Sequence, residues 1–369
     1  MAEAAEQLAQ RLRAAVSLVP RDAYTAAHAA LGLLFLVTRC VLMPVALQML
    51  AYAAGILYIG AHQSLPILHK AEPLSRKDAV LLPAAGSAVL LCAFLAYRLF
   101  GKPLVDLLLT GVLVLIGSAA LAESLRPALA PLLPEEARRQ EFRWNLRVPF
   151  LHKAEDKPLE LSFGKDRMVA YGVAGVAAAA YCYTKSWTIH NLLAVGFSLQ
   201  AVALVSYGRF AVGLALLCGC FLYDAVWALS GQAGASTSSQ LAGPIQVICP
   251  ASWEPWRVAG LGLGDIVIPG IFVAMCLRFD AHNHKSASEE VLNALSDFPK
   301  PYFWRAYGAY LVALLIAGIT MSAFGRQQPP LLLLAPGTTL TLLGCSYARD
   351  EFSKMLAYNE EELMPSKAE

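Results

Sequence analysis

Two aspartates stand out because each lies inside a long apolar run. Asp224 occurs in FLYDAVWAL, and Asp265 occurs in AGLGLGDIVIPGIFV, just after Gly262 and Gly264. A charge at membrane depth costs at least about 2.5–3.5 kcal/mol on insertion scales and usually marks a working site. Two carboxyls that meet in a poorly solvated place share one proton, because both cannot ionise at close range. Such a pair can act as general acid and general base toward a water molecule.

The glycines before Asp265 suggest why an acid is placed there. Without side chains, Gly262 and Gly264 let another backbone approach the carboxyl, and they tolerate unusual dihedral angles. An extended peptide could lie at this position. The alternative for Asp224 and Asp265 is a pair of buried carboxyls that only bridge helices. Asp106 also lies in an apolar run, but it is near the start of its segment, so we interpret it as a solvated end residue.

The composition is that of a membrane protein. The chain has 369 residues, of which 57% are hydrophobic and 15% are charged. Soluble domains are about 45–50% apolar and about 25% charged. The net charge of +2 is too small to indicate nucleic-acid binding. Most of the eight cysteines fall in apolar runs, which favours packing residues over a disulfide framework or a metal site.

The elements that must position the two acids are membrane-spanning helices. A helix needs about 20 apolar residues to cross a bilayer. Nine segments satisfy this requirement, so we expect an all-α polytopic membrane protein: 41–61, 79–97, 104–122, 168–184, 187–206, 210–229, 259–277, 302–324 and 329–347. We interpret 29–38 as a short interfacial or re-entrant piece, with one long tilted helix as the alternative. Residues 3–19 suit an amphipathic surface helix.

The distribution of Lys and Arg predicts the orientation. If the N-terminus is lumenal, the loops on the cytosolic side carry 19 Lys and Arg residues and the opposite side carries nine, with Arg305 inside a helix. The sequence therefore predicts a lumenal N-terminus and a cytosolic C-terminus. Along the chain this gives a lumenal N-terminal segment, helices 1–5 with a basic 3–4 loop, catalytic helices 6–9 and a cytosolic tail: 1–40, 41–206, 207–347 and 348–369.

A third element with unusual backbone is RQQPPLLLLAPG at 326–337. Pro329 and Pro330 remove two backbone donors, which we expect to leave carbonyls open. Irregular backbone at membrane depth is tolerated only where it is buried or lines a wet cavity. The alternative is an ordinary proline in the first turn of a helix.

Together these pieces resemble the intramembrane aspartyl proteases of the signal peptide peptidase and presenilin clan. That family is marked by Tyr-Asp in helix 6, Gly-x-Gly-Asp in helix 7 and Pro-Ala-Leu in helix 9. The matching positions here are Tyr223-Asp224, Gly262-Leu263-Gly264-Asp265 and Pro329-Pro330-Leu331. The similarity runs from about Ser75 to about Tyr358. The short 231–258 connection favours the signal peptide peptidase branch over presenilin, which has a long hydrophilic segment there.

The resemblance implies a presenilin-like bundle of nine transmembrane helices with Asp224 and Asp265 as the catalytic residues. It implies no cofactor and no metal. Implied substrates are transmembrane segments of type II orientation, including remnant signal peptides, in the endoplasmic reticulum membrane. The partners are then these peptides and the lipid bilayer, with no nucleic acid and with a homo-oligomer left open. Residues implied to support the active site are Tyr223, Gly262, Leu263, Gly264, Pro329, Pro330 and Leu331.

Two other functions stay open. Pro330 stands where the family has alanine, and a spoiled site would leave a non-catalytic membrane scaffold. Paired acids at mid-membrane also suit a proton- or cation-coupled transporter. The glycines beside Asp265 and the proline segment are features that accommodate a peptide, so they favour the protease.

Overall fold

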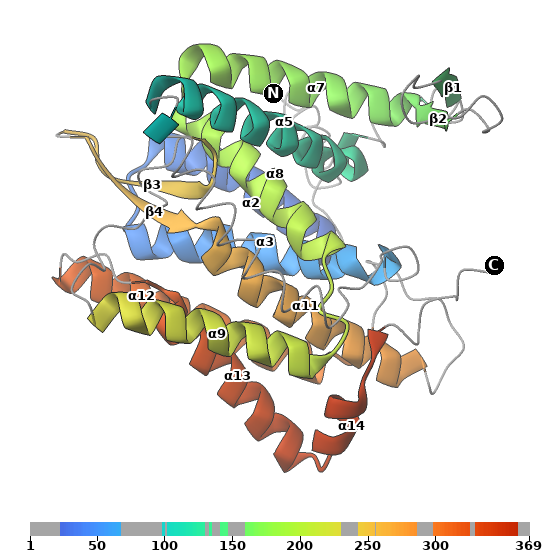
Figure 1. Ribbon diagram of the computed structural model, residues 1–369, viewed down its shortest axis with the longest axis vertical. Coiled ribbons are helices and arrows are strands. Elements are labelled where there is room, and N and C mark those ends of the chain that lie inside the picture. The colour runs from blue at the N-terminus through green and yellow to red at the C-terminus, as the bar shows by residue number, and fades with distance from the viewer. Residues whose placement is uncertain are drawn as a thin grey trace, which may run out of the picture.

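The protein is built mainly of helices, which run side by side with a β-hairpin at one end (Figure 1). The computed structural model describes residues 23–67, 98–99, 102–129, 133–134, 141–146, 159–229, 243–254, 256–285, 298–324 and 329–360. The helices are α2 (Ala23–Cys40), α3 (Val45–Ile67), α5 (Lys102–Leu129), α7 (Lys165–Thr184), α8 (Trp187–Leu204), α9 (Phe210–Leu229), α11 (Leu263–Lys285), α12 (Pro301–Phe324), α13 (Leu331–Ala348) and α14 (Phe352–Ala357). Two antiparallel hairpins pair β1 (Glu141–Leu146) with β2 (Leu159–Gly164) and β3 (Gln246–Ser252) with β4 (Arg257–Gly262).

Within the described residues, six helices are long and apolar enough to cross a membrane: α2, α3, α5, α8, α12 and α13. Helices α7, α9 and α11 occupy three more of the predicted spans. The predicted span 79–97 and the predicted surface helix 3–19 lie outside the described residues. The expectation of a polytopic helical membrane protein is confirmed, and the total of nine spans stays a prediction.

Helix α11 forms the centre of the bundle and contacts α3, α8, α12, α13 and α9. Every residue from Ile271 to Phe279 is almost completely buried. The apolar residues of α11 therefore pack against protein, whereas α5 exposes Leu107, Leu108 and Leu115 on its outer face. Exposed leucines of this kind are what a lipid-facing helix requires. The acid-bearing helix is thus the best enclosed of the bundle.

Two predicted boundaries are wrong. Residues 29–38 are not a short separate piece, because they belong to α2, a continuous helix of 18 residues that ends at Cys40. The chain then turns at 41–44, so α2 and α3 are not one long helix either. Helix α11 begins at Leu263 rather than at 259, because 257–262 pairs as a strand with β3. Apolar composition predicted burial there but could not separate a strand from a helix.

Close helix packing depends on glycines, as Gly196 and Gly270 illustrate. A Cβ added to Gly196 in α8 would lie 2.8 Å from the Cα of Leu121 in α5. A Cβ on Gly270 in α11 would lie 2.8 Å from Val202 Cγ2 in α8. Small residues that let helix backbones approach are a common device of membrane proteins.

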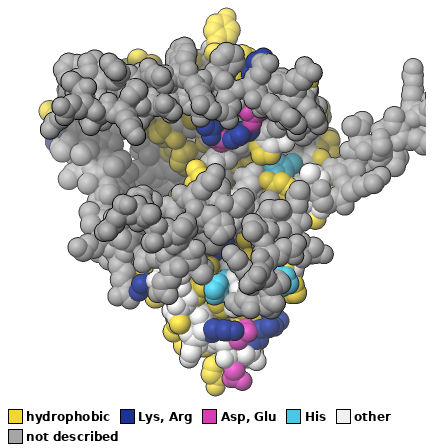
Figure 2. Space-filling view, turned by 90° about the vertical axis from the view of Figure 1, so that its right-hand side faces the viewer, with side chains coloured by type: hydrophobic (Ala, Val, Ile, Leu, Met, Phe, Trp, Pro, Cys, Tyr) yellow, Lys and Arg dark blue, Asp and Glu magenta, His cyan; other side chains and the backbone are white. Residues whose placement is uncertain are grey.

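Segments that were predicted to share a side of the membrane lie at the same end of the bundle. Figure 2 looks onto the end where β1, β2 and α14 lie, and charged and histidine side chains gather there. Ion pairs join α5 to α7 at this end, with 2.7 Å between Arg126 Nε and Asp166 Oδ2. At the opposite end, which carries the β3–β4 hairpin, the rings of Trp187, Trp253 and Trp256 cluster with centroids 5.5–6.4 Å apart. Tryptophan is enriched at membrane interfaces.

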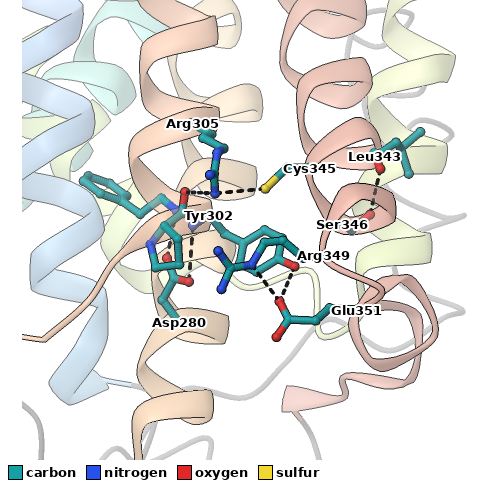
Figure 3. Close-up of polar contacts among 10 residues, drawn as sticks. Asp280, Tyr302, Arg305, Leu343, Cys345, Ser346, Arg349 and Glu351 are labelled. Carbon is teal, nitrogen blue, oxygen red and sulfur yellow. Dashed lines mark hydrogen bonds and ion pairs between the residues drawn. The ribbon is translucent and has the colours of Figure 1, made fainter.

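A polar network ties α11, α12 and α13 together at the charged end (Figure 3). The Asp280 carboxylate of α11 accepts hydrogen bonds from the backbone N–H groups of Tyr302 and Phe303, at 3.3 and 2.8 Å. It thereby satisfies two donors in the first turn of α12. The Tyr302 hydroxyl donates to Glu351 Oε2 at 2.6 Å and lowers the pKa of that carboxyl. The far end of α11 is therefore held in place by hydrogen bonds as well as by packing.

Gly196→Ala should destabilise the bundle, because the added methyl group would push α8 away from the α5 backbone. Overpacking of this kind costs about 1–3 kcal/mol. Gly172→Ala in α7 is the matched control, since nothing lies within 4 Å of the added Cβ and alanine favours the helix. The check is the thermal unfolding midpoint of both variants in detergent. Equal midpoints would contradict the packing argument.

Candidate active site

Asp265 lies in the first turn of α11, directly after β4. A negative charge is favourable at a helix N-terminus, where backbone N–H groups lack helical partners. The backbone of Gly262 donates a hydrogen bond back to the Asp265 carboxyl. This is the acidic half of a capping box. The turn of α11 therefore provides a local reason for a carboxylate at this depth.

The two glycines before Asp265 have different roles. A Cβ on Gly262 would stand 3.0 Å from Asp265 Oδ2, so a side chain there would crowd the carboxyl. A Cβ on Gly264 would meet nothing within 4 Å. No packing inside the described protein therefore requires glycine at 264. Its missing side chain leaves open space one residue from the acid.

A proline explains how the backbone of Asp265 is held. Pro269 lies inside α11 and has no N–H group, so the carbonyl four residues earlier loses its helical donor. That carbonyl belongs to Asp265, and the Tyr310 hydroxyl of α12 donates to it at 3.2 Å. Tyr207, before α9, donates to the carbonyl of Ile268 at 2.8 Å. Neither tyrosine was predicted from the sequence, although a proline four residues after Asp265 indicates that the Asp265 carbonyl lacks its helical donor.

Asp224 lies in α9, which contacts α11. The carboxyls of Asp224 and Asp265 are within electrostatic range of each other. Both also interact electrostatically with Cys220, one turn before Asp224. Asp224 Oδ2 is buried and has no hydrogen-bond partner within the described part of the protein. Buried polar atoms are nearly always paired, so an orphan oxygen needs an explanation. An oxygen that awaits a water or a substrate group is such an explanation.

The other predicted residues divide into buried and exposed ones. Leu263 and Leu331 are buried in the main apolar core. Tyr223 turns outward, with 58% of its surface exposed. It therefore lies beside Asp224 in the chain but on the outer side of α9.

Pro329 and Pro330 precede α13, which contacts both α9 and α11. The Pro329 carbonyl accepts from Leu332 N, and the Pro330 carbonyl accepts from the N–H groups of Leu333 and Leu334. These two carbonyls are the first acceptors of α13. The carbonyls that lose a helical donor to Pro329 and Pro330 lie four residues earlier, at 325 and 326, outside the described residues, so the expectation that they stay open remains a prediction. Pro330 itself has helical dihedral angles. The alternative of a proline at helix entry describes the segment better.

The sequence pattern of the signal peptide peptidase family matches residues 68–362. The chain belongs to the signal peptide peptidase family. It is 28% identical to mouse signal peptide peptidase over 294 residues, which cover 78% of this chain and 74% of the mouse protein. The human protein is 27% identical over the same length and shares of the chains. A probable intramembrane protease of Schizosaccharomyces pombe is 25% identical and covers 82% of this chain and 90% of its own length.

The fold is also that of a solved structure. A presenilin-family intramembrane aspartate protease superposes with a TM-score of 0.52 at 16% identity, covering 83% of this chain and 100% of that chain. Together with the family match, this identifies a multi-pass membrane hydrolase of the aspartic intramembrane protease class. The resemblance seen in the three sequence motifs is confirmed at the level of the family.

Tyr310→Phe should destabilise the protein by about 1–3 kcal/mol, because the Asp265 carbonyl is left buried and unpaired. Pro269→Ala restores the helical N–H donor for that carbonyl, so Tyr310→Phe should cost less in the Pro269→Ala background. The check is a double-mutant cycle of unfolding midpoints in detergent.

Tyr307→Phe is the matched control for this cycle, because Tyr307 donates instead to the Ala54 carbonyl of α3 at 3.0 Å. It should show no coupling to Pro269→Ala. The explanation fails if Tyr310→Phe costs the same with Pro269 as with alanine.

Proposed function

We propose that this chain cleaves transmembrane segments of type II orientation within the endoplasmic reticulum membrane, remnant signal peptides among them. Asp224 and Asp265 share one proton and activate a water molecule for attack on the scissile carbonyl. The observation that carries the proposal is that two carboxyls, on the contacting helices α9 and α11, lie within electrostatic range of each other at a place where one Asp224 oxygen has no partner in the described part of the protein.

The proposed chemistry needs both carboxyls in different protonation states. The ionised carboxyl takes a proton from water as the hydroxide oxygen bonds to the peptide carbon. The protonated carboxyl gives its proton to the carbonyl oxygen, which yields a neutral tetrahedral intermediate. Collapse breaks the C–N bond: the carboxyl that took the proton from water gives it to the leaving nitrogen, and the other, now ionised, takes a proton from a hydroxyl of the intermediate. The pair ends with one proton, as it began.

The surroundings of Asp265 support an extended substrate. A peptide in a helix hides its scissile carbonyl in its own hydrogen bonds, so it must first be unwound. Strand β4 leads directly into Gly262 and Asp265, and the space beside Gly264 is open. An extended segment beside β4 would bring a carbonyl to the acids. The names of the mouse and human relatives give signal peptides as their substrates, which supports that substrate class here.

The location follows the same reasoning. The Lys and Arg bias supports a cytosolic side for the end that carries β1, β2 and α14. The C-terminus is then cytosolic, and the β3–β4 hairpin faces the lumen. Type II segments enter with their N-terminal end on the cytosolic side.

Asp224→Asn and Asp265→Asn should each reduce cleavage of a fluorogenic transmembrane peptide by at least about a thousand-fold, since one acid cannot be donor and acceptor in the same step. Asparagine keeps the size of the side chain, so detergent elution profile and unfolding midpoint should stay near the wild-type values. Turnover within tenfold of wild type in either folded variant would sink the proposed dyad.

The rate should depend on pH as a bell, because only the singly protonated pair is active. At low pH both carboxyls are protonated and no base remains; at high pH both are ionised and no acid remains. The measurement is kcat of purified enzyme across pH, with folding verified at each end. A rate that stays flat from strongly acidic to alkaline pH is incompatible with a shared proton.

Gly264→Val should lower kcat/KM by about 10–100-fold without lowering the unfolding midpoint, because the new side chain fills the substrate's place rather than the protein's core. Gly111→Val in α5 is the control: its added Cβ also meets nothing within 4 Å, and α5 packs mainly against α7 and α8 rather than against the acid-bearing α9 and α11. Equal kcat/KM for the two variants would show that the space beside Gly264 is unused.

A further inference from the structure

The outer edge of β3 is covered by polar side chains from the surrounding helices. Asn191 of α8 donates to the Ile248 carbonyl and accepts from the Ile248 N–H group, both at 2.7 Å. Gln48 of α3 donates to the Pro250 carbonyl at 2.8 Å. His190 Nε2 lies 3.0 Å from the Gln246 carbonyl. Three alternate residues of the strand are thus bonded on the side away from β4.

The pairing register shows which groups of β4 point the other way. In an antiparallel pair, residues opposite each other either exchange both backbone bonds or point both sets of bonds outward. Ile248 points outward to Asn191, and its partner in the register is Gly260. Gly260 therefore also points outward, on the far edge of β4, and Val258 and Gly262 do the same by alternation.

The two outer edges of the β3–β4 hairpin differ in how accessible their backbone groups are to another strand. Asn191 and Gln48 are almost completely buried, so the β3 edge is closed. Val258 on β4 is 43% exposed, and no strand of the described part of the chain pairs with this edge. An unpaired edge of backbone groups is a template for another strand.

We infer that Asn191, supported by His190 and Gln48, is a positioning residue that closes β3 and fixes the hairpin. The inference rests on the proposed function. An extended substrate then has one edge to pair with, and the register along Val258 and Gly260 sets which peptide bond reaches Asp265. Loss of Asn191 uncovers the N–H and carbonyl of Ile248. The hairpin then shifts, and the substrate is no longer cut at a single peptide bond.

The test compares Asn191→Leu with Ser198→Ala on one transmembrane peptide, with products identified by mass spectrometry. Ser198 is an equally buried polar residue of α8, but within the described residues its side chain bonds only to its own helix, at the Ala194 carbonyl. Asn191→Leu should spread cleavage over neighbouring peptide bonds and lower kcat by about tenfold, with KM changed less. Ser198→Ala should keep the wild-type cut and rate.

Asn191→Asp keeps the acceptor for the Ile248 N–H group but loses the donor. Its kcat and its spread of cleavage positions should therefore fall between those of wild type and Asn191→Leu. The same variant provides the test if Asn191→Leu does not fold. Wild-type cleavage position and kcat in a folded Asn191 variant overturn the inference. Active Asp224→Asn or Asp265→Asn enzyme would instead overturn the proposed function, whatever Asn191 does.

A second, independent observation concerns α2. It runs antiparallel to α3: Tyr24 and His62 have ring centroids 6.4 Å apart, and Thr38 Oγ1 lies 3.0 Å from the Tyr52 hydroxyl. Arg39 at its end lies over Trp187, with 5.9 Å between the guanidinium and the ring centroid. Helix α2 therefore reaches from the level of the α3 C-terminus to the tryptophan cluster.

Length and surface agree with a complete crossing. Eighteen residues make a helix of about 27 Å, close to the thickness of the hydrocarbon core. Leu33 and Leu36 are 59% and 66% exposed, as expected of a face in lipid. We infer that α2 is a further membrane span and that its N-terminal end at Ala23 lies on the same side of the membrane as α14, contrary to the expected lumenal N-terminus.

The charge distribution supports this placement independently. Arg11, Arg13 and Arg21 precede α2. With them on the side of the C-terminus, that side carries 22 Lys and Arg residues and the opposite side carries six, in place of 19 and nine. The positive-inside bias becomes stronger.

Glycosylation mapping tests the placement, because the chain contains no Asn-x-Ser/Thr acceptor of its own. One acceptor on a flexible tag is placed before residue 1, after residue 369 or within 231–242, in three separate variants expressed in microsomes. We expect the first two tags to have the same glycosylation state and the third to differ. An N-terminal tag that matches the 231–242 acceptor would overturn the inference.

Discussion

A carboxylate at the first turn of α11 is the constraint on which the rest of the structure depends. Its cost at membrane depth is reduced by the helix N-terminus and by the Gly262 N–H group, and in the proposed mechanism also by the Asp224 carboxyl, with which it shares one proton. The Asp265 backbone is fixed separately, because Pro269 frees its carbonyl for Tyr310. The same few residues therefore place the acid and leave its carboxyl available.

This arrangement requires α11 to be enclosed at both ends. At the hairpin end, β3 and β4 deliver the chain to Gly262, and buried side chains of α3 and α8 hold β3. At the other end, Asp280 caps α12, and Arg278 pairs with Glu360 of the C-terminal segment at 2.7 Å. Both Arg278 and Glu360 are buried, so the pair must remain intact to be tolerated. Helix α11 is thus the fixed element against which α9 and its Asp224 are placed.

The sequence predicted the membrane class and eight helices of the described chain near their observed positions, because apolar length is a strong local signal. It also singled out Asp224 and Asp265 as isolated charges, and the structure places them on helices that contact each other, while their catalytic role stays a prediction. The sequence could not predict that 257–262 is a strand, because local composition does not indicate the pairing with 246–252. It likewise missed α2, where Arg39, Cys40 and Pro44 interrupt the apolar pattern. Asn191, Tyr207 and Tyr310 act through partners distant in the chain, so only the fold reveals them.

The central claim is that Asp224 and Asp265 flank the carbon that becomes tetrahedral. The most direct measurement is the affinity of a peptide with a hydroxyethylene group in place of the scissile amide, compared with the same peptide carrying a plain ethylene group. The wild-type enzyme should bind the hydroxyl form at least about a hundred-fold more tightly, as expected of a transition-state mimic. Asp224→Asn and Asp265→Asn should each lose that preference while still binding both peptides. A preference that survives in either variant would contradict the two-carboxyl site.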